Sequence, residues 1–246
     1  MMAEATATIN VCIKKGMLSQ RRKERKERKN SLIVSCVVRG ALLLFLVLFA
    51  SLRETLPEMK LLIHVCCAPC LIGPLEALRQ EGMQPGGFFY NPNIHPFLEF
   101  RKRVKALRVF LEKDALPVEI IAEYGLELFM REVYRPDRRE RCRNCHFLRL
   151  RRTAERAKEM GFNAFTTTLL GSPHQDHELL RESGERAAET ASVSFLYRDF
   201  RPLHERSREV ARRRQLYLQP YCGCCFSEYE RFRDTGRELY RGSGPR

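Results

Sequence analysis

Short apolar segments alternate with longer amphipathic ones from residue 61 to residue 214, and this alternation constrains the fold more than any other feature of the chain. Segments with the length and apolar content of buried parallel strands occur at residues 61–65, 86–90, 117–122, 165–169 and 193–197. Helices are expected over residues 73–81, 96–113, 126–134, 142–160, 177–190 and 204–214. Repeated β–α units predict an α/β fold in which one parallel sheet is covered by helices on both faces.

We expect a Rossmann-like or nucleotide-hydrolase-like arrangement, followed by a cysteine-rich C-terminal segment. In such sheets the ligand crevice lies at the carboxyl ends of the strands. A cysteine group at 66–70 follows the first predicted strand, Asn91-Pro92-Asn93 follows the second, and Ser172-Pro173-His174 follows the fourth. These three turns are therefore predicted to meet at one edge of the sheet.

Residues 1–58 differ in composition from the rest of the chain. Lys and Arg outnumber Asp and Glu there by 11 to 5, and an apolar stretch at 32–52 is interrupted by Arg39. Three interpretations compete: an upstream extension or false start before Met59, a membrane anchor of about 20 residues, and a secretion signal with its apolar core at 41–50. We favour the first and expect a chain that begins at Met59 to be soluble and active. The first two interpretations leave the body cytoplasmic, tethered to a membrane if 32–52 is a retained span.

Eight of the ten cysteines fall into three groups in the remaining sequence: Cys66, Cys67 and Cys70; Cys142 and Cys145; Cys222, Cys224 and Cys225. In a reducing compartment, clustered cysteines indicate metal or redox chemistry. Cys142 and Cys145 share one face at the predicted start of a helix, where the positive helix end favours thiolates. Thiolates ligate both zinc and iron–sulfur clusters, and spacing alone leaves both open.

Glycine between Cys222 and Cys224 permits the tight backbone of a short disulfide loop, which is easily reduced. A redox-cycling pair is one interpretation of these two residues, and metal ligation is the other. Spacing assigns no role to Cys225.

The body also carries a basic excess, with 33 Lys and Arg against 25 Asp and Glu from residue 59 onward. Such a surplus favours an anionic partner, of which nucleic acid is the most common. Three runs could meet backbone phosphates, although each could equally be a solvated helix face: residues 101–103, 149–152 and 212–214.

The motifs at residues 62–70, 90–96, 142–145, 166–175 and 221–227 together resemble the cobalamin-independent epoxyqueuosine reductase family, the QueH type. The resemblance extends from Met59 to about Arg231, and members of the family usually begin where Met59 stands. It implies that residues 59–246 form a single α/β iron–sulfur catalytic domain that associates stably with no membrane.

The resemblance implies an oxidoreductase that converts epoxyqueuosine at the tRNA wobble position to queuosine, the last step of queuosine biosynthesis. Its substrates would be the His, Asp, Asn and Tyr tRNAs, and its electron donor is unidentified. The family uses a [4Fe–4S] cluster and no cobalamin. By motif, the cluster ligands would be Cys66, Cys67, Cys142 and Cys145, and the redox-active pair, able to form a disulfide bond, would be Cys222 and Cys224.

Some assignments stay open. Cys70 could replace Cys66 or Cys67, because adjacent cysteines bind one cluster with difficulty. The family also holds a further iron, for which Cys70 and Asp176 are the candidate ligands. Protons could come from His95 or His174 on the predicted edge loops, with His177 a further candidate. His64 lies in a strand, where a core role is the more common one.

Two other functions compete with this interpretation. An iron–sulfur tRNA thiolase would need a glycine-rich phosphate loop after the first strand, where this chain has Cys66-Cys67-Ala68-Pro69-Cys70. A zinc-stabilised RNA-binding module without catalysis would be colourless and would keep its metal under reduction.

Overall fold

The computed structural model describes residues 59–234, which belong to one unit of the chain, Met59–Arg246. The segments for which an extension, a membrane anchor or a secretion signal were predicted lie outside the described residues. Within 59–234, no helix is both long enough and apolar enough to cross a bilayer.

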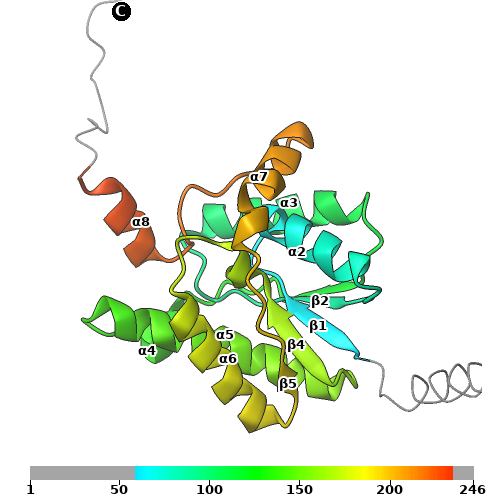
Figure 1. Cartoon of the computed structure of the whole chain (residues 1–246). Coiled ribbons are helices and arrows are strands. Elements are labelled where there is room, and N and C mark those ends of the chain that lie inside the picture. The colour runs from blue at the N-terminus through cyan, green and yellow to red at the C-terminus, as the bar shows by residue number, and fades with distance from the viewer. Residues whose placement is uncertain (1–58, 235–246) are drawn as a thin grey trace, which may run out of the picture. The chain divides into compact units, whose positions relative to one another are not determined.

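A five-stranded sheet in the order β3-β2-β1-β4-β5 forms the centre of this unit (Figure 1). Its strands are β1 (Leu61–His64), β2 (Gly86–Phe89), β3 (Val118–Ile120), β4 (Ala164–Thr167) and β5 (Ser194–Phe195). Every neighbouring pair is parallel. The predicted parallel α/β fold is confirmed, and its strand order is the Rossmann order.

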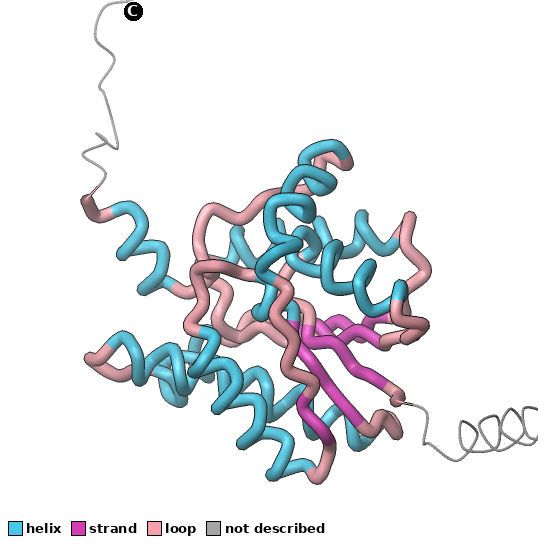
Figure 2. The backbone as a smooth tube through the Cα atoms, in the orientation of Figure 1, coloured by secondary structure: helices cyan, strands magenta, loops and turns pink. Residues whose placement is uncertain are grey.

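Helices cover both faces of the sheet, as the tube in Figure 2 also shows. One face carries α2 (Ala68–Gln80), α3 (Phe97–Leu111) and α7 (His204–Arg213). The other carries α4 (Leu126–Val133), α5 (Arg138–Glu159) and α6 (His177–Ala191), of which α5 packs against both β1 and β4. The remaining elements are two short 3₁₀ turns, η1 (Thr168–Gly171) and η2 (Arg201–Leu203), and a last helix, α8 (Cys225–Phe232).

The chain leaves β1 toward α2 on one face and leaves β4 toward α6 on the other. The two strands are neighbours with His64 opposite Thr167, so the connections after them diverge at the carboxyl edge. In open α/β sheets this reversal of strand order is where a crevice forms.

The helices differ from the predicted ranges in three places. α2 begins at Ala68 rather than residue 73, because Pro69 lies in the first turn, where its missing N–H is not needed. α5 begins at Arg138, four residues before the predicted start, because the Asp137 carboxylate caps it by accepting from the Glu140 N–H at 2.8 Å. The helix α8 was not predicted. The end of α5 agrees with the prediction, because Gly161 follows it with φ +76°, as expected of a C′ glycine.

Candidate metal and redox site

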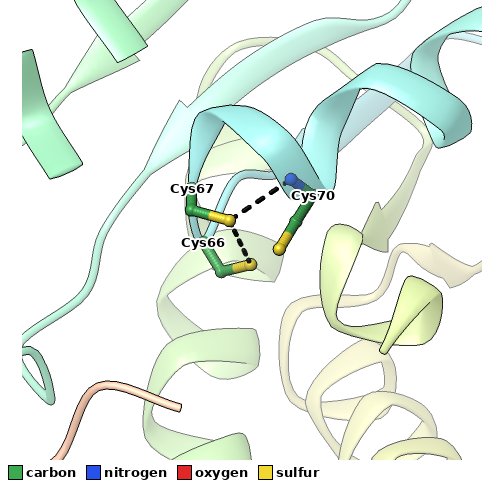
Figure 3. A group of neighbouring side chains, drawn as sticks. All are labelled: Cys66, Cys67 and Cys70. Atoms are coloured by element: carbon green, nitrogen blue, oxygen red, sulfur yellow. Dashed lines mark hydrogen bonds between the residues drawn. The ribbon is translucent and has the colours of Figure 1, made fainter. Parts of the chain in front are cut away.

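Three sulfur atoms converge where β1 meets α2. Those of Cys66, Cys67 and Cys70 all lie within 4.8 Å of one another and point toward a common centre (Figure 3). Cys67 is the N-cap of α2, and its sulfur accepts from the Cys70 N–H at 3.3 Å. The buried strand β1 and the capped helix α2 therefore fix the backbone of the whole group.

Polar donors from distant segments point at these sulfur atoms. The Thr168 hydroxyl donates to Cys66 Sγ at 3.1 Å. Gln219 Nε2 donates to Cys67 Sγ at 3.0 Å and to Cys70 Sγ at 3.2 Å. Hydrogen bonds from the Cys67 and Cys70 thiols hold the pKa of Cys66 well below its usual value. Desolvation raises the pKa of Cys67, so the group stabilises one thiolate at a time.

A second group of cysteines lines a neighbouring cavity of about 390 Å³. It consists of Cys142 and Cys145 on α5 with Cys222 and Cys224 from the C-terminal segment. Burial raises the pKa of the Cys145 thiol to about 12 and also raises that of Cys142. The prediction that Cys142 and Cys145 lie at a helix start was wrong: they lie a turn or more inside α5, away from its N-terminal N–H groups.

The Cys222 side chain is oriented by a short polar chain. Gln175 Nε2 donates to Cys222 Sγ at 3.3 Å, and Gln175 Oε1 lies 3.0 Å from His146 Nε2. Cys224 caps α8 and accepts from the Ser227 N–H at 3.3 Å. All eight described cysteines are free thiols, and Gly223 between the pair has φ +140°, a conformation that favours glycine.

Arg103 holds the loop that carries Cys222. Its side chain is 2 % exposed and its Nε lies 2.7 Å from Glu99 Oε1. The same guanidinium donates to the Tyr221 and Cys222 carbonyls, each at 2.9 Å. The second oxygen of Glu99 accepts from the Tyr217 hydroxyl. A buried ion pair on α3 thus fixes a backbone segment more than a hundred residues away.

The outer wall of the cavity is formed in part by α8. Phe226 of α8 stacks on Tyr134 at a ring separation of 5.9 Å, and the Arg141 guanidinium lies 4.5 Å from its ring centre. Glu230 forms ion pairs with Arg141 at 3.1 Å and with Arg138 at 3.4 Å. None of the residues of α8 is buried.

The two cysteine groups are adjacent but separate. Among residues 59–234, only Cys66, Cys67 and Cys70 form a group of three potential ligands whose ligand atoms all lie within 4.8 Å of one another. Cys142 and Cys145 belong to the neighbouring cavity, as does Asp176, whereas Cys70 does not line it. The buried Arg149 interacts electrostatically with Cys145, Cys222, Cys66 and Cys224, members of both groups.

The predicted histidines lie in different surroundings. His95 is 3 % exposed between the rings of Tyr124 and Phe129, and burial lowers its pKa to about 4. His174 is exposed and lines the cavity. His64 is buried with Nδ1 2.9 Å from the Thr167 hydroxyl, and desolvation lowers its pKa to about 4. His177 lies 3.2 Å from the Tyr197 hydroxyl, outside the cavity lining.

Asp176 caps α6 at the mouth of the cavity. Its carboxylate accepts from the Glu178 and Leu179 N–H groups, both at 3.1 Å, and lies 3.6 Å from Arg139 Nε. The hydrogen bond from Leu179 contributes most to lowering its pKa. The carboxylate is therefore ionised and already has partners.

The epoxyqueuosine reductase QueH family model matches residues 61–230. The chain belongs to this family. Relatives that carry the name epoxyqueuosine reductase QueH include the following three proteins. The protein from Dehalococcoides mccartyi is 37% identical over 182 residues, which cover 70% of this chain and 94% of the relative. That from Thermotoga maritima is 33% identical over 192 residues, covering 74% and 97%. That from Haemophilus influenzae is 35% identical over 190 residues, covering 73% and 77%. The family resemblance expected from the motifs is confirmed.

Several residues of this candidate site were missed or misassigned in the sequence. Arg103 and Arg149 were assigned to phosphate-binding runs, but both are buried, with exposures of 2 % and 1 %. Gln219 and His146 were not singled out. A signal existed for Arg149, because it falls on the buried stripe of α5 that also contains Cys145, Thr153 and Ala157. Gln219 gives no such signal, because its contact with Cys67 spans 152 residues.

Proposed function

We propose that this chain reduces epoxyqueuosine in tRNA to queuosine with an iron–sulfur cluster. The proposed activity is supported by membership of the epoxyqueuosine reductase QueH family. The observation that carries the chemistry is the convergence of three sulfur atoms within 4.8 Å at the carboxyl end of the central strand. Soft thiolate ligands of this kind suit iron–sulfur clusters.

We propose that the thiols of the two adjacent cysteine groups together hold a [4Fe–4S] cluster and a further iron. Cys66, Cys67, Cys142 and Cys145 are the proposed cluster ligands, with Cys70 as the alternative to one of the adjacent pair. A buried thiol with a raised pKa keeps its proton at neutral pH unless a metal binds the sulfur and displaces that proton. The Cys145 thiol is of this kind. A bound cluster would supply electrons one at a time and an iron that accepts the epoxide oxygen. Cys70 and Asp176 remain the candidate ligands for the further iron.

The redox balance of the reaction suits the C-terminal cysteines. Removing the epoxide oxygen as water, with formation of the alkene, takes two electrons and two protons. Oxidation of the Cys222 and Cys224 thiols to one disulfide releases that same number of each. We propose that this pair supplies them and that an unidentified electron donor regenerates the dithiol. The Gln175 hydrogen bond holds Cys222 Sγ at the cavity, and His174 lines the same cavity as a candidate proton donor.

The basic residues support a tRNA substrate. Arg138, Arg139 and Arg141 line the cavity, and the first two are 73 % and 55 % exposed at their side chains. Exposed guanidinium groups beside a cavity can hold backbone phosphates while one nucleoside enters it. We propose that the protein acts in the cytoplasm, because eight free thiols persist most readily in a reducing compartment.

The alternatives have less support. At the position where a thiolase would need a phosphate-cradling glycine loop, Cys67 caps α2 through its own sulfur. A non-catalytic zinc module would leave the family match without an explanation.

The proposal is tested by anaerobic purification followed by iron and sulfide analysis, and by turnover of tRNA that carries epoxyqueuosine. We expect a brown protein whose absorption bleaches with dithionite. Cys66→Ser should lose iron, whereas Cys222→Ser should keep iron and lose turnover, the first one included. A colourless protein with one zinc and no turnover would refute the proposal.

A further inference from the structure

Arg149 is a cation enclosed by cysteines. Its side chain is 1 % exposed on α5, and Nε donates to the Cys145 carbonyl at 3.2 Å. It faces no carboxylate within the described residues that forms an ion pair with it. Burying a guanidinium without an anion costs several kcal/mol, so its place needs an explanation.

One end of this guanidinium has no partner. Nη2 is fully buried without a hydrogen-bond partner among residues 59–234. Arg149 lines the cavity that also contains Cys145, Cys222 and Cys224. An unpaired buried donor on a charged group points to a partner that is anionic when the site is complete.

Arg103 offers an informative comparison. It is almost equally buried, at 2 %, but its guanidinium is matched by Glu99 at 2.7 Å and by two backbone carbonyls. The fold therefore neutralises one buried arginine with its own carboxylate and leaves the charge of Arg149 facing sulfur. The two arginines serve different purposes.

We propose that Arg149 is a positioning residue whose fixed positive charge balances the anionic sulfur of the iron–sulfur site and stabilises the electron added on one-electron reduction. This inference rests on the proposed function. No bond would form or break at Arg149: a cluster held by these cysteines would take up one electron, and the positive charge of the guanidinium would lower the energy of the more negative state. A cation in a low-dielectric enclosure acts strongly on such a charge.

The test uses the full chain with its iron–sulfur cluster loaded and dithionite as reductant. Arg149→Met should shift the one-electron reduction equilibrium toward the oxidised form by at least tenfold, which is 59 mV. Arg149→Lys, which keeps the charge, should recover most of that shift. The matched control is Arg156→Met, seven residues further along α5, where the side chain is 30 % exposed and forms ion pairs with Glu119 and Glu159. It should titrate like the wild type.

A second readout does not depend on the potential. Loading the site raises the melting temperature of the wild type, because iron binds the folded state. The rise should be smaller in Arg149→Met than in the wild type and unchanged in Arg156→Met, whatever the stability of each iron-free protein. If Arg149→Met folds but takes up no iron, the loss of the whole rise supports the proposal.

Two outcomes overturn it. One is Arg149→Met with wild-type iron content, wild-type potential and wild-type thermal rise, in which case Arg149 is only a packing residue. The other is an Arg149→Lys variant that is as defective as Arg149→Met, which would make shape rather than charge the cause. In both, a wild type that holds iron and reduces its tRNA substrate leaves the proposed function intact. A wild type without iron would overturn both.

Discussion

Replacing Arg103 by methionine removes the cation of a buried pair and releases the cysteine loop. Glu99 is 5 % exposed, and the change leaves its carboxylate without its 2.7 Å partner. Breaking a buried ion pair by removing one member costs about 3–5 kcal/mol. The hydrogen bonds to the Tyr221 and Cys222 carbonyls are lost as well. With a urea m-value of about 2 kcal/mol/M, we expect the unfolding midpoint to fall by about 1.5–2.5 M.

The assay is equilibrium urea unfolding of the iron-free protein, followed by circular dichroism, at pH 7. Glu99→Leu combined with Arg103→Met should cost less than the sum of the single variants, because no unpaired charge stays buried. Arg131→Met provides the exposed control: Arg131 pairs with Glu132 at 3.0 Å, but its side chain is 70 % exposed. It should change stability by less than about 1 kcal/mol. A cost below 1 kcal/mol for Arg103→Met, or full additivity in the double variant, would refute the reasoning.

Three further changes test single side chains. The unfolded state protonates His95 below pH 6.5, but the folded state does so only near its lowered pKa of about 4. The contribution of His95 to stability is therefore complete above pH 6.5 and falls by about 2 kcal/mol by pH 5. His95→Phe should remove that part of the loss measured by urea unfolding at the two pH values, and an undiminished loss would contradict the assignment. Gln219→Leu removes the donors to Cys67 and Cys70, so iron should pass to a chelator about tenfold more readily, and equal retention would contradict this. Asp176→Ala should lower the free energy of unfolding by about 1 kcal/mol through the lost α6 cap, and Asp176→Asn should hardly change it. Equal melting temperatures for the wild type and Asp176→Ala would exclude the capping role. Loss of iron from Asp176→Asn without loss of stability would add a ligand role.

The sheet could be read from the sequence because its strands are buried on both faces. Leu61–His64 and Ala164–Thr167 consist of residues that are almost wholly buried, and such runs stand out against polar helices. The convergence of the turns after β1 and β4 then follows from the parallel topology. Helix starts were less accurate, since Cys67 caps α2 with a side chain that is not a common cap residue.

The finer organisation of the site could not be read in the same way. Arginine-rich runs are usually solvated, so Arg103 and Arg149 were assigned to the surface, although the buried stripe of α5 could have identified Arg149 as turned inward. The division of the cysteines into a compact group and a cavity group depends on packing between α5, α2 and the C-terminal segment, which no local pattern encodes. Gln175 shows the same limit: its motif was noted, but its position between Cys222 and His146 depends on three segments far apart in the chain.

The two sides of the cysteine cavity differ in what holds them. Cys145 projects from a helix packed on the central strands, so moving it would disturb the core of the sheet. The opposite side, α8, has no fully buried residue and is held by the packing of Phe226 on Phe129 and Tyr134 and by the Glu230 ion pairs. Swinging that helix outward would uncover the buried cluster of Phe129, Val133, Cys145 and Leu148, against which Cys225 and Phe226 pack. The last helix therefore keeps water from the Cys145 side of the cavity, although it contributes no fully buried residue of its own.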